Sequence, residues 1–152
     1  MSNKAHLLAG LLATLTITTF FLSTVLVELV GSQEAVATVK RLIVLPGLLI
    51  LVPAIAATGG SGFSLAKARK GQLIDAKKKR MPFIAANGLL VLIPCAIVLN
   101  HWAAAGEFDT TFYAAQALEL LAGAANLTLM GLNIRDGMKL SGRFRAGSTT
   151  AR

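Results

Sequence analysis

The apolar residues of this chain are gathered in four long runs, which cover about residues 7–30, 42–60, 83–102 and 111–134. A buried helix of a soluble protein is typically about 10–14 residues long, whereas crossing the hydrocarbon of a bilayer takes about 20. The runs have the second length. They predict an all-α fold in which residues 1–152 form one transmembrane domain, a polytopic bundle of four helices with a basic loop at 61–82 and a basic tail at 135–152.

Prolines and glycines occur within these runs and at their ends. Pro46 and Pro53 lie inside the second run and Pro94 lies inside the third. Proline removes a backbone donor and bends a helix, so each of them predicts a bend. The glycine-rich stretch at 58–62 is expected to end the second helix, and residues 135–137 are expected to end the fourth.

Composition supports a membrane protein. Hydrophobic residues make up 55% of the chain and charged residues only 14%, against about 25% charged in ordinary soluble domains. The net charge of +8 does not indicate a nucleic-acid partner, because the basic residues flank the apolar runs, where membrane topology and anionic lipids account for them. The single cysteine, Cys95, lies within an apolar run and is interpreted as a small core residue.

The distribution of Lys and Arg predicts the orientation. Thirteen of the fifteen basic residues lie at Lys4, in the segment 61–82 or in the tail 135–152. Only Lys40 and Arg41 lie between the first and second runs. Because cytoplasmic segments of membrane proteins carry the excess of basic residues, both termini are expected to be cytoplasmic.

The segment between the second and third runs carries a second prediction. Residues 63–80 could form a basic surface helix that touches anionic head groups, or the charges could serve only to set topology. The residues expected at the lipid surface are Lys67, Arg69, Lys70, Lys77, Lys78, Lys79 and Arg80.

Polar and small residues recur along the fourth run at alternating spacings of three and four. These residues, called the seam below, are Gln116, Glu119, Gly123, Asn126, Met130, Asn133 and Gly137. Such a seam must face protein, because lipid would leave its amides and carboxylate unpaired. It is either helix–helix packing or a pocket or pathway for a small ligand, an ion or a proton, formed by Gln116, Glu119, Asn126 and Asn133.

Glu119 is the informative member of the seam. It lies about eight residues, or roughly 12 Å, into its helix, and a carboxylate at that depth needs a cationic partner or a proton. Arg41 is the expected partner, with Glu28 competing for it. Glu28, Arg41 and Glu119 would then form a cluster near His101, either as a structural ion-pair network or as a site.

The two histidines bear on cofactor binding. His6 begins the first run and His101 ends the third, so they are expected near opposite faces of the membrane and cannot ligate one haem within a monomer. A haem held by His6 alone stays open as an alternative. The sequence shows no metal-ligand spacing, nucleophile–base pair or phosphate-binding loop. We therefore expect no enzyme, metal or cofactor.

The last third of the chain carries a resemblance. The segments 112–120 and 131–137 resemble a group of uncharacterised small bacterial inner-membrane proteins with four helices, and the likeness extends to the basic segment and to residues 82–87. His6 and the bent second run are more distantly similar to copper-resistance and b561-type four-helix membrane proteins. Those use several intramembrane histidines, which this chain lacks. The resemblance implies a multi-pass protein of the bacterial inner membrane.

These observations lead to one expected function and two alternatives. The expected function is a non-enzymatic structural or accessory protein that associates with itself or with a larger membrane complex, in contact with membrane lipids. The first alternative is a carrier of a small molecule, an ion or a proton through the polar residues around Glu119. The second is a haem-binding electron carrier using His6. A tightly packed seam would favour the accessory role, whereas a pocket at Glu119 would favour the carrier.

Overall fold

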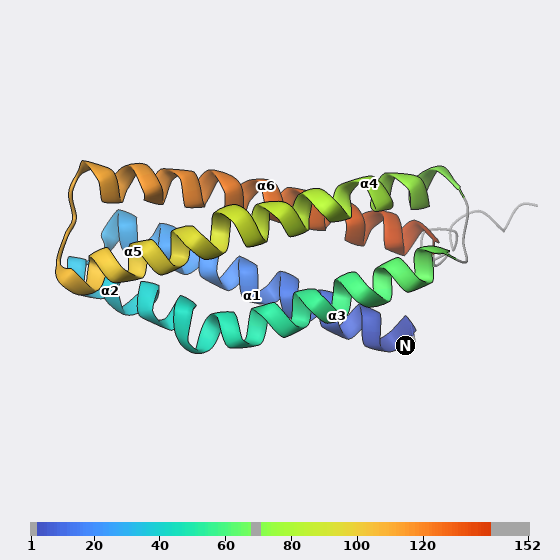
Figure 1. Ribbon diagram of the computed structural model, residues 1–152, viewed down its shortest axis with the longest axis horizontal. Coiled ribbons are helices and arrows are strands. Elements are labelled where there is room, and N and C mark those ends of the chain that lie inside the picture. Colours follow the sequence, from blue (N-terminus) through green and yellow to red (C-terminus); the bar gives the residue numbers. More distant parts are fainter. Residues whose placement is uncertain (1–2, 68–70, 141–152) are drawn as a thin grey trace, which may run out of the picture.

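The computed structural model describes residues 3–67 and 71–140, which form four long helical spans (Figure 1). Each span is long and apolar enough to cross a membrane, and the predicted all-α bundle is confirmed. The first span is α1 (Asn3–Val30). The second consists of α2 (Gln33–Leu42), the π-helical η1 (Ile43–Gly47) and α3 (Leu48–Lys67). The third consists of α4 (Gln72–Asn87), the π-helical η2 (Gly88–Leu92) and α5 (Ile93–Ala105), and the fourth is α6 (Thr110–Leu140).

The spans are arranged as a ring in chain order. The first span packs against the second through α1 and α3, and the second span packs against the third through α2 and α5. The third span packs against the fourth through α4 and α6. Contacts between α6 and α1 close the ring. One end of the bundle, called the terminal end, carries Asn3 and Leu140 (Figure 1). The other, the turn end, carries the turns at residues 31–32 and 106–109.

The helices extend further than the sequence pattern predicts. α3 continues through the glycines at 58–62 to Lys67, and α4 already begins at Gln72, so the prediction of a loop is wrong for residues 61–67 and 72–82, which are helical. α6 likewise continues past 135–137 to Leu140. A glycine in a helix costs only about 1 kcal/mol relative to alanine, which packing can offset. Gly62, for example, is buried.

Prolines have different effects in the two bent spans. The second span breaks at η1, where Leu45 has the extended angles φ −137° and ψ 117° directly before Pro46. In the third span, Pro94 is at the start of α5 and the irregular turn η2 precedes it. A wider turn there accommodates a residue that cannot donate a backbone hydrogen bond. Pro53 does not interrupt α3.

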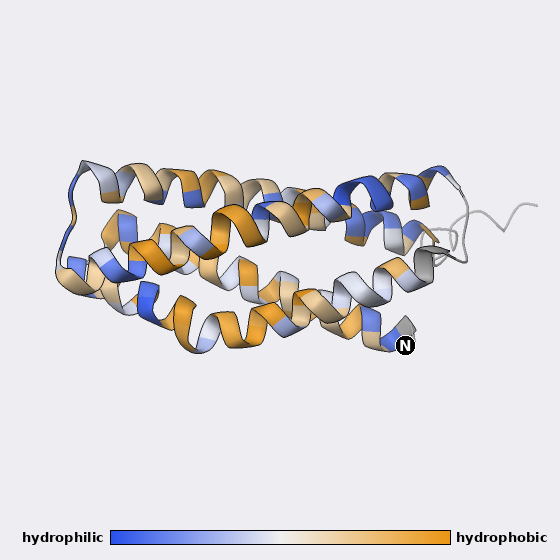
Figure 2. Cartoon of the chain, viewed as in Figure 1, coloured by the Kyte–Doolittle hydropathy of each residue, from blue (hydrophilic) through white to orange (hydrophobic). Residues whose placement is uncertain are grey.

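The buried core is small and the outer surface is apolar. Two groups of buried side chains hold the ring together. One comprises Ala13, Ile17, Leu51 and Ala54, and the other, toward the turn end, comprises Val36, Leu99, Ala103 and Phe112. Many leucines point outward instead, and hydrophilic residues are concentrated toward the two ends of the bundle (Figure 2). An apolar exterior between polar ends is the pattern that a lipid environment favours.

Candidate functional site

The polar seam of α6 lies inside the bundle. Gln116 and Asn126 are buried, and only 12% of the Glu119 side chain is exposed. Gly123 is also buried, and a Cβ at its position would meet the ring of Phe21 on α1 at 3.2 Å. The small residue thus allows α1 and α6 to approach closely between the polar positions.

Glu119 forms a buried ion pair with Lys40, not with Arg41. The Lys40 ammonium donates to Glu119 Oε2, and the Lys40 side chain is fully buried. Gln116 Nε2 donates to the same carboxylate oxygen at 3.1 Å. Arg41 is exposed, so the prediction that it is the partner of Glu119 is wrong.

Helix geometry explains the error. Residues 33–41 lie between the first and second predicted runs, but they belong to the helix α2, in which Val36 and Lys40 are buried. The two lie four residues apart and therefore on one face, whereas Arg41 is rotated by about 100° from Lys40. Buried positions continue with the same periodicity at Ile43 and Gly47. This spacing of four, three and four is the sequence signal that identifies Lys40.

Glu28 completes the polar group at this depth, called the Lys40 cluster below: Glu28, Lys40, Gln116 and Glu119. Glu28 on α1 is partly buried and interacts electrostatically with both Lys40 and Glu119. Its Oε1 atom and that of Gln116 are buried and make no hydrogen bond within the described residues. Glu119 thus has a cationic partner as predicted, but the partner is Lys40 instead of Arg41, and the described residues show no ion pair of Glu28. His101, expected nearby, is exposed.

An amide pair joins α4 to α6 further along the seam. Asn87 Nδ2 donates to Asn126 Oδ1 at 2.9 Å and to the carbonyl of Ala122 at 2.8 Å. Asn126 Nδ2 donates in turn to the carbonyl of Ile84 at 3.4 Å. Sequence reasoning identified Asn126 but missed Asn87, which lies in the third span at the depth where a buried amide needs a partner.

A second ion-pair group lies toward the terminal end. Arg80 Nη1 contacts Asp136 Oδ2 at 2.6 Å, and Arg135 Nη2 contacts the other carboxylate oxygen at 3.3 Å. Asp136 is only 1% exposed. Arg80 Nη1 also lies 3.5 Å from Asn133 Oδ1. Sequence reasoning treated Asp136 as part of a helix terminator, although it follows Asn133 by three residues and therefore lies on the same side of α6 as the seam.

The basic residues predicted at the lipid surface have different environments. Lys78 and Lys79 are exposed and Lys77 is partly buried. Arg80 turns inward to Asp136 because that buried carboxylate needs a cation, so the prediction for Arg80 is wrong. Arg69, Lys70 and the side chain of Lys67 lie outside the described part of the chain.

The histidines lie toward opposite ends of the bundle, as α1 and α5 place them. His6 is partly buried, and its Nδ1 atom is 2.8 Å from Ser61 Oγ on α3. Within residues 3–67 and 71–140, no group of three or more His, Cys, Asp or Glu side chains could hold a metal ion. Cys95 is partly buried and forms no disulfide.

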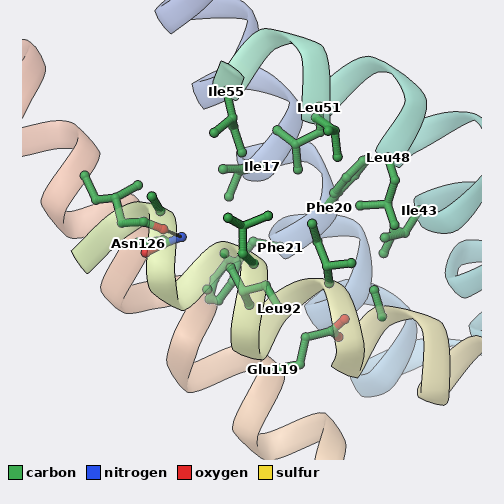
Figure 3. Close-up of a pocket in the computed structure, with 18 of the residues that line it drawn as sticks. Ile17, Phe20, Phe21, Ile43, Leu48, Leu51, Ile55, Leu92, Glu119 and Asn126 are labelled. Carbon is green, nitrogen blue, oxygen red and sulfur yellow. Dashed lines mark hydrogen bonds between the residues drawn. The ribbon is translucent and has the colours of Figure 1, made fainter. Parts of the chain in front are cut away.

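Two adjoining cavities lie inside the ring of helices. The central cavity measures about 340 Å³ and is lined by apolar side chains of all four spans, with Thr24, Glu119 and Asn126 as the polar members. In Figure 3, Ile17, Leu51 and Leu92 approach the same space, with Glu119 and Asn126 on the α6 side.

The second cavity lies toward the terminal end and is called the basic cavity. It measures about 510 Å³ and is lined by His6, Lys77, Lys78 and Asn133 together with apolar residues. Four residues line both cavities: Ile55, Gly59, Ile84 and Ala85. The two cavities therefore adjoin along the bundle.

The fold and the cavities define a four-helix bundle whose spans suit a membrane and whose interior is hollow and partly polar. No protein-family model, curated protein or solved structure matches the chain.

Proposed function

We propose that this chain is a multi-pass membrane protein that binds a small, mainly apolar molecule inside its helix bundle and carries or presents it within the bilayer. The central cavity carries this proposal. Its volume of about 340 Å³ falls within the roughly 300–1,000 Å³ of small-molecule sites, which combine an apolar lining with a few polar groups.

The cavity extends to the lipid-facing side of the bundle. Val52 on α3 and Leu89 on η2 both line it, and they are 43% and 59% exposed. A molecule dissolved in the bilayer could therefore enter between the second and third spans without passing through water. The second span is bent at η1 and the third contains the wide turn η2, and residues of both segments line the cavity.

The cavity also supports the carrier alternative more than the accessory role. A fully packed seam would have favoured a structural or accessory role, in which Glu119 and Asn126 serve only as contacts between helices. Instead, both residues line an open volume while they keep their hydrogen bonds. This arrangement supports ligand binding, with the polar groups held in place before a ligand arrives.

Gly59 provides a direct test because it lines both cavities and a Cβ there would meet no atom within 4 Å. Gly59→Leu should place a side chain in the cavity and weaken binding of Nile red about tenfold or more, the effect expected from overfilling a site. Gly60→Leu is the matched control, since Gly60 is exposed and equally unobstructed. Fluorescence titration of the full chain in mild detergent measures both.

Parent protein and Gly60→Leu should bind the dye saturably with the same affinity. Equal, unsaturable binding by all three proteins would mean that the dye enters only the detergent, and ligand binding in the cavity would then be wrong.

We further propose that both termini are cytoplasmic in a bacterial inner membrane, with anionic lipids around the terminal end. Lys4, Lys78 and Lys79 are exposed toward that end, whereas Lys40, one of the two Lys and Arg residues that the described ranges place toward the turn end, is buried in an ion pair. The positive-inside bias is therefore stronger for exposed charges than for the sequence as a whole.

Reporter fusions test this orientation. A reporter placed after Arg152 should be active only in its cytoplasmic form, and one inserted at residues 106–110 only in its external form. Activity of both fusions on the same side would contradict four membrane-crossing spans.

A further inference from the structure

We propose that the bound molecule is a single-chain anionic amphiphile, such as a long-chain fatty acid. Its carboxylate lies in the basic cavity and its chain extends into the central cavity. This inference rests on the proposed function and adds the chemical class and the orientation of the ligand.

The charge of the basic cavity supports an anionic head group. Lys77, Lys78 and His6 line it, and none of its lining residues is Asp or Glu. The nearest carboxylate in the sequence of α6, Asp136, does not line the cavity and is held by Arg80 and Arg135. An anion entering this cavity therefore meets two lysines among the described residues that line it.

Lys77 and Lys78 both lie on α4, but the basic cavity that they line is also lined by residues of other helices. The Lys77 ammonium lies 3.4 Å from the position that a Cβ would take at Gly137 on α6. Because Gly137 has no side chain, the ammonium can extend over α6 beside the cavity. His6 lies on α1, where Ser61 on α3 fixes its ring. Residues of all four spans thus position Lys77 and His6 around one space.

The combined length and the polarity of the two adjoining cavities support a chain-like ligand. Along α1, lining residues run from His6 in the basic cavity to Thr24 in the central cavity, a length of roughly 27 Å at the helical rise per residue. The lining is polar at the terminal end and almost wholly apolar beyond the shared residues. At the far end, Glu119 lines the central cavity and is paired with Lys40, which does not line it, so the described lining residues present no cationic side chain to an anion there.

The test compares three fluorescent probes of equal chain length, a fatty acid, the corresponding alcohol and the corresponding alkylammonium, on the full chain in mild detergent. The fatty acid should bind most tightly and the alkylammonium most weakly. The double substitution Lys77→Gln and Lys78→Gln should weaken fatty-acid binding about 25-fold, or about fivefold for each basic residue lost. Binding of the alcohol should change little.

The matched control is the double substitution Lys4→Gln and Lys79→Gln. It changes the net charge equally, and neither residue lines a cavity. This control should bind the fatty acid like the parent, and so should the charge-preserving pair Lys77→Arg and Lys78→Arg. Thermal unfolding of each variant separates loss of binding from loss of fold.

The outcomes distinguish the inference from the function on which it rests. Equal binding of acid and alcohol, or an equal loss in the two Gln pairs, would overturn the anionic head group while leaving ligand binding intact. Competition by acetate as effective as that by the fatty acid would overturn the chain-like ligand. If Gly59→Leu retained fatty-acid binding, the chain would not lie in the central cavity. Absence of saturable binding by any probe or by Nile red would overturn both proposals.

Discussion

Replacing Lys40 with methionine is expected to destabilise the protein by about 3–5 kcal/mol, the cost of leaving a buried charge without its partner. Lys40 is fully buried and its ammonium donates to Glu119 Oε2. Methionine fills a similar volume but removes the charge, so that Glu119 keeps only the hydrogen bond from Gln116. Thermal unfolding in detergent measures the loss.

Arg41→Met is the matched control for this substitution. Arg41 is adjacent in sequence and equally basic, but it is exposed, and exposed ion pairs contribute only about 0–1 kcal/mol. Its removal should leave the unfolding temperature almost unchanged. Equal losses in Lys40→Met and Arg41→Met would contradict the ion pair that the structure places at Glu119.

A double-substitution cycle separates the pair from its surroundings. Glu119→Gln should also destabilise the protein, because Lys40 then remains buried without a carboxylate. Combining Lys40→Met with Glu119→Gln should cost less than the sum of the single losses, since neither unpaired charge remains. Strict additivity would show that the two side chains do not interact.

Arg80→Met is expected to have the second-largest effect on stability. Asp136 is 1% exposed, and Arg80 is its closest cation, at 2.6 Å. The loss should be smaller than for Lys40→Met, because Arg80 is partly exposed and Arg135 still contacts the other carboxylate oxygen. Thermal unfolding again measures the effect, with Lys79→Met as the control, since Lys79 is adjacent and exposed.

The same pair predicts how the third and fourth spans are held together. Arg80 is on α4 and Asp136 on α6, so Arg80→Met should loosen the terminal end of this helix pair. Hydrogen exchange should rise at residues 132–140 and stay unchanged near Glu119, toward the turn end. Unchanged exchange at residues 132–140 together with an unchanged unfolding temperature would show that Asp136 does not depend on Arg80.

Much of the fold follows from the sequence because its causes are local. An apolar run long enough to cross hydrocarbon predicts a spanning helix wherever it occurs in a chain, and this chain has four such runs. The break at Pro46 follows from the missing backbone donor. The inward orientation of Gln116, Glu119 and Asn126 follows from their shared helix face and from the cost of unpaired polar groups in lipid.

Other features could only be decided by the packing of one span against another. Glycines at 58–62 have a weak local preference against helix, which the contacts of α3 with α1 outweigh. Whether Lys40 or Arg41 reaches Glu119 depends on the rotation of α2 about its axis. That rotation is set by the buried side chains against which Val36 packs. The role of Asp136 depends in the same way on the arginine that α4 brings beside it.

The cavities are the clearest case of a property that no local pattern contains. A cavity is the volume that side chains from several helices fail to fill, so it depends on the distances between the spans. The sequence determined that α6 carries a carboxylate and amides facing inward. Only the tertiary structure decided that Glu119 and Asn126 border an open space and that this space adjoins a second one lined by Lys77 and Lys78. The reason is that periodicity along one helix specifies which face is buried, whereas the position of its neighbours specifies what that face meets.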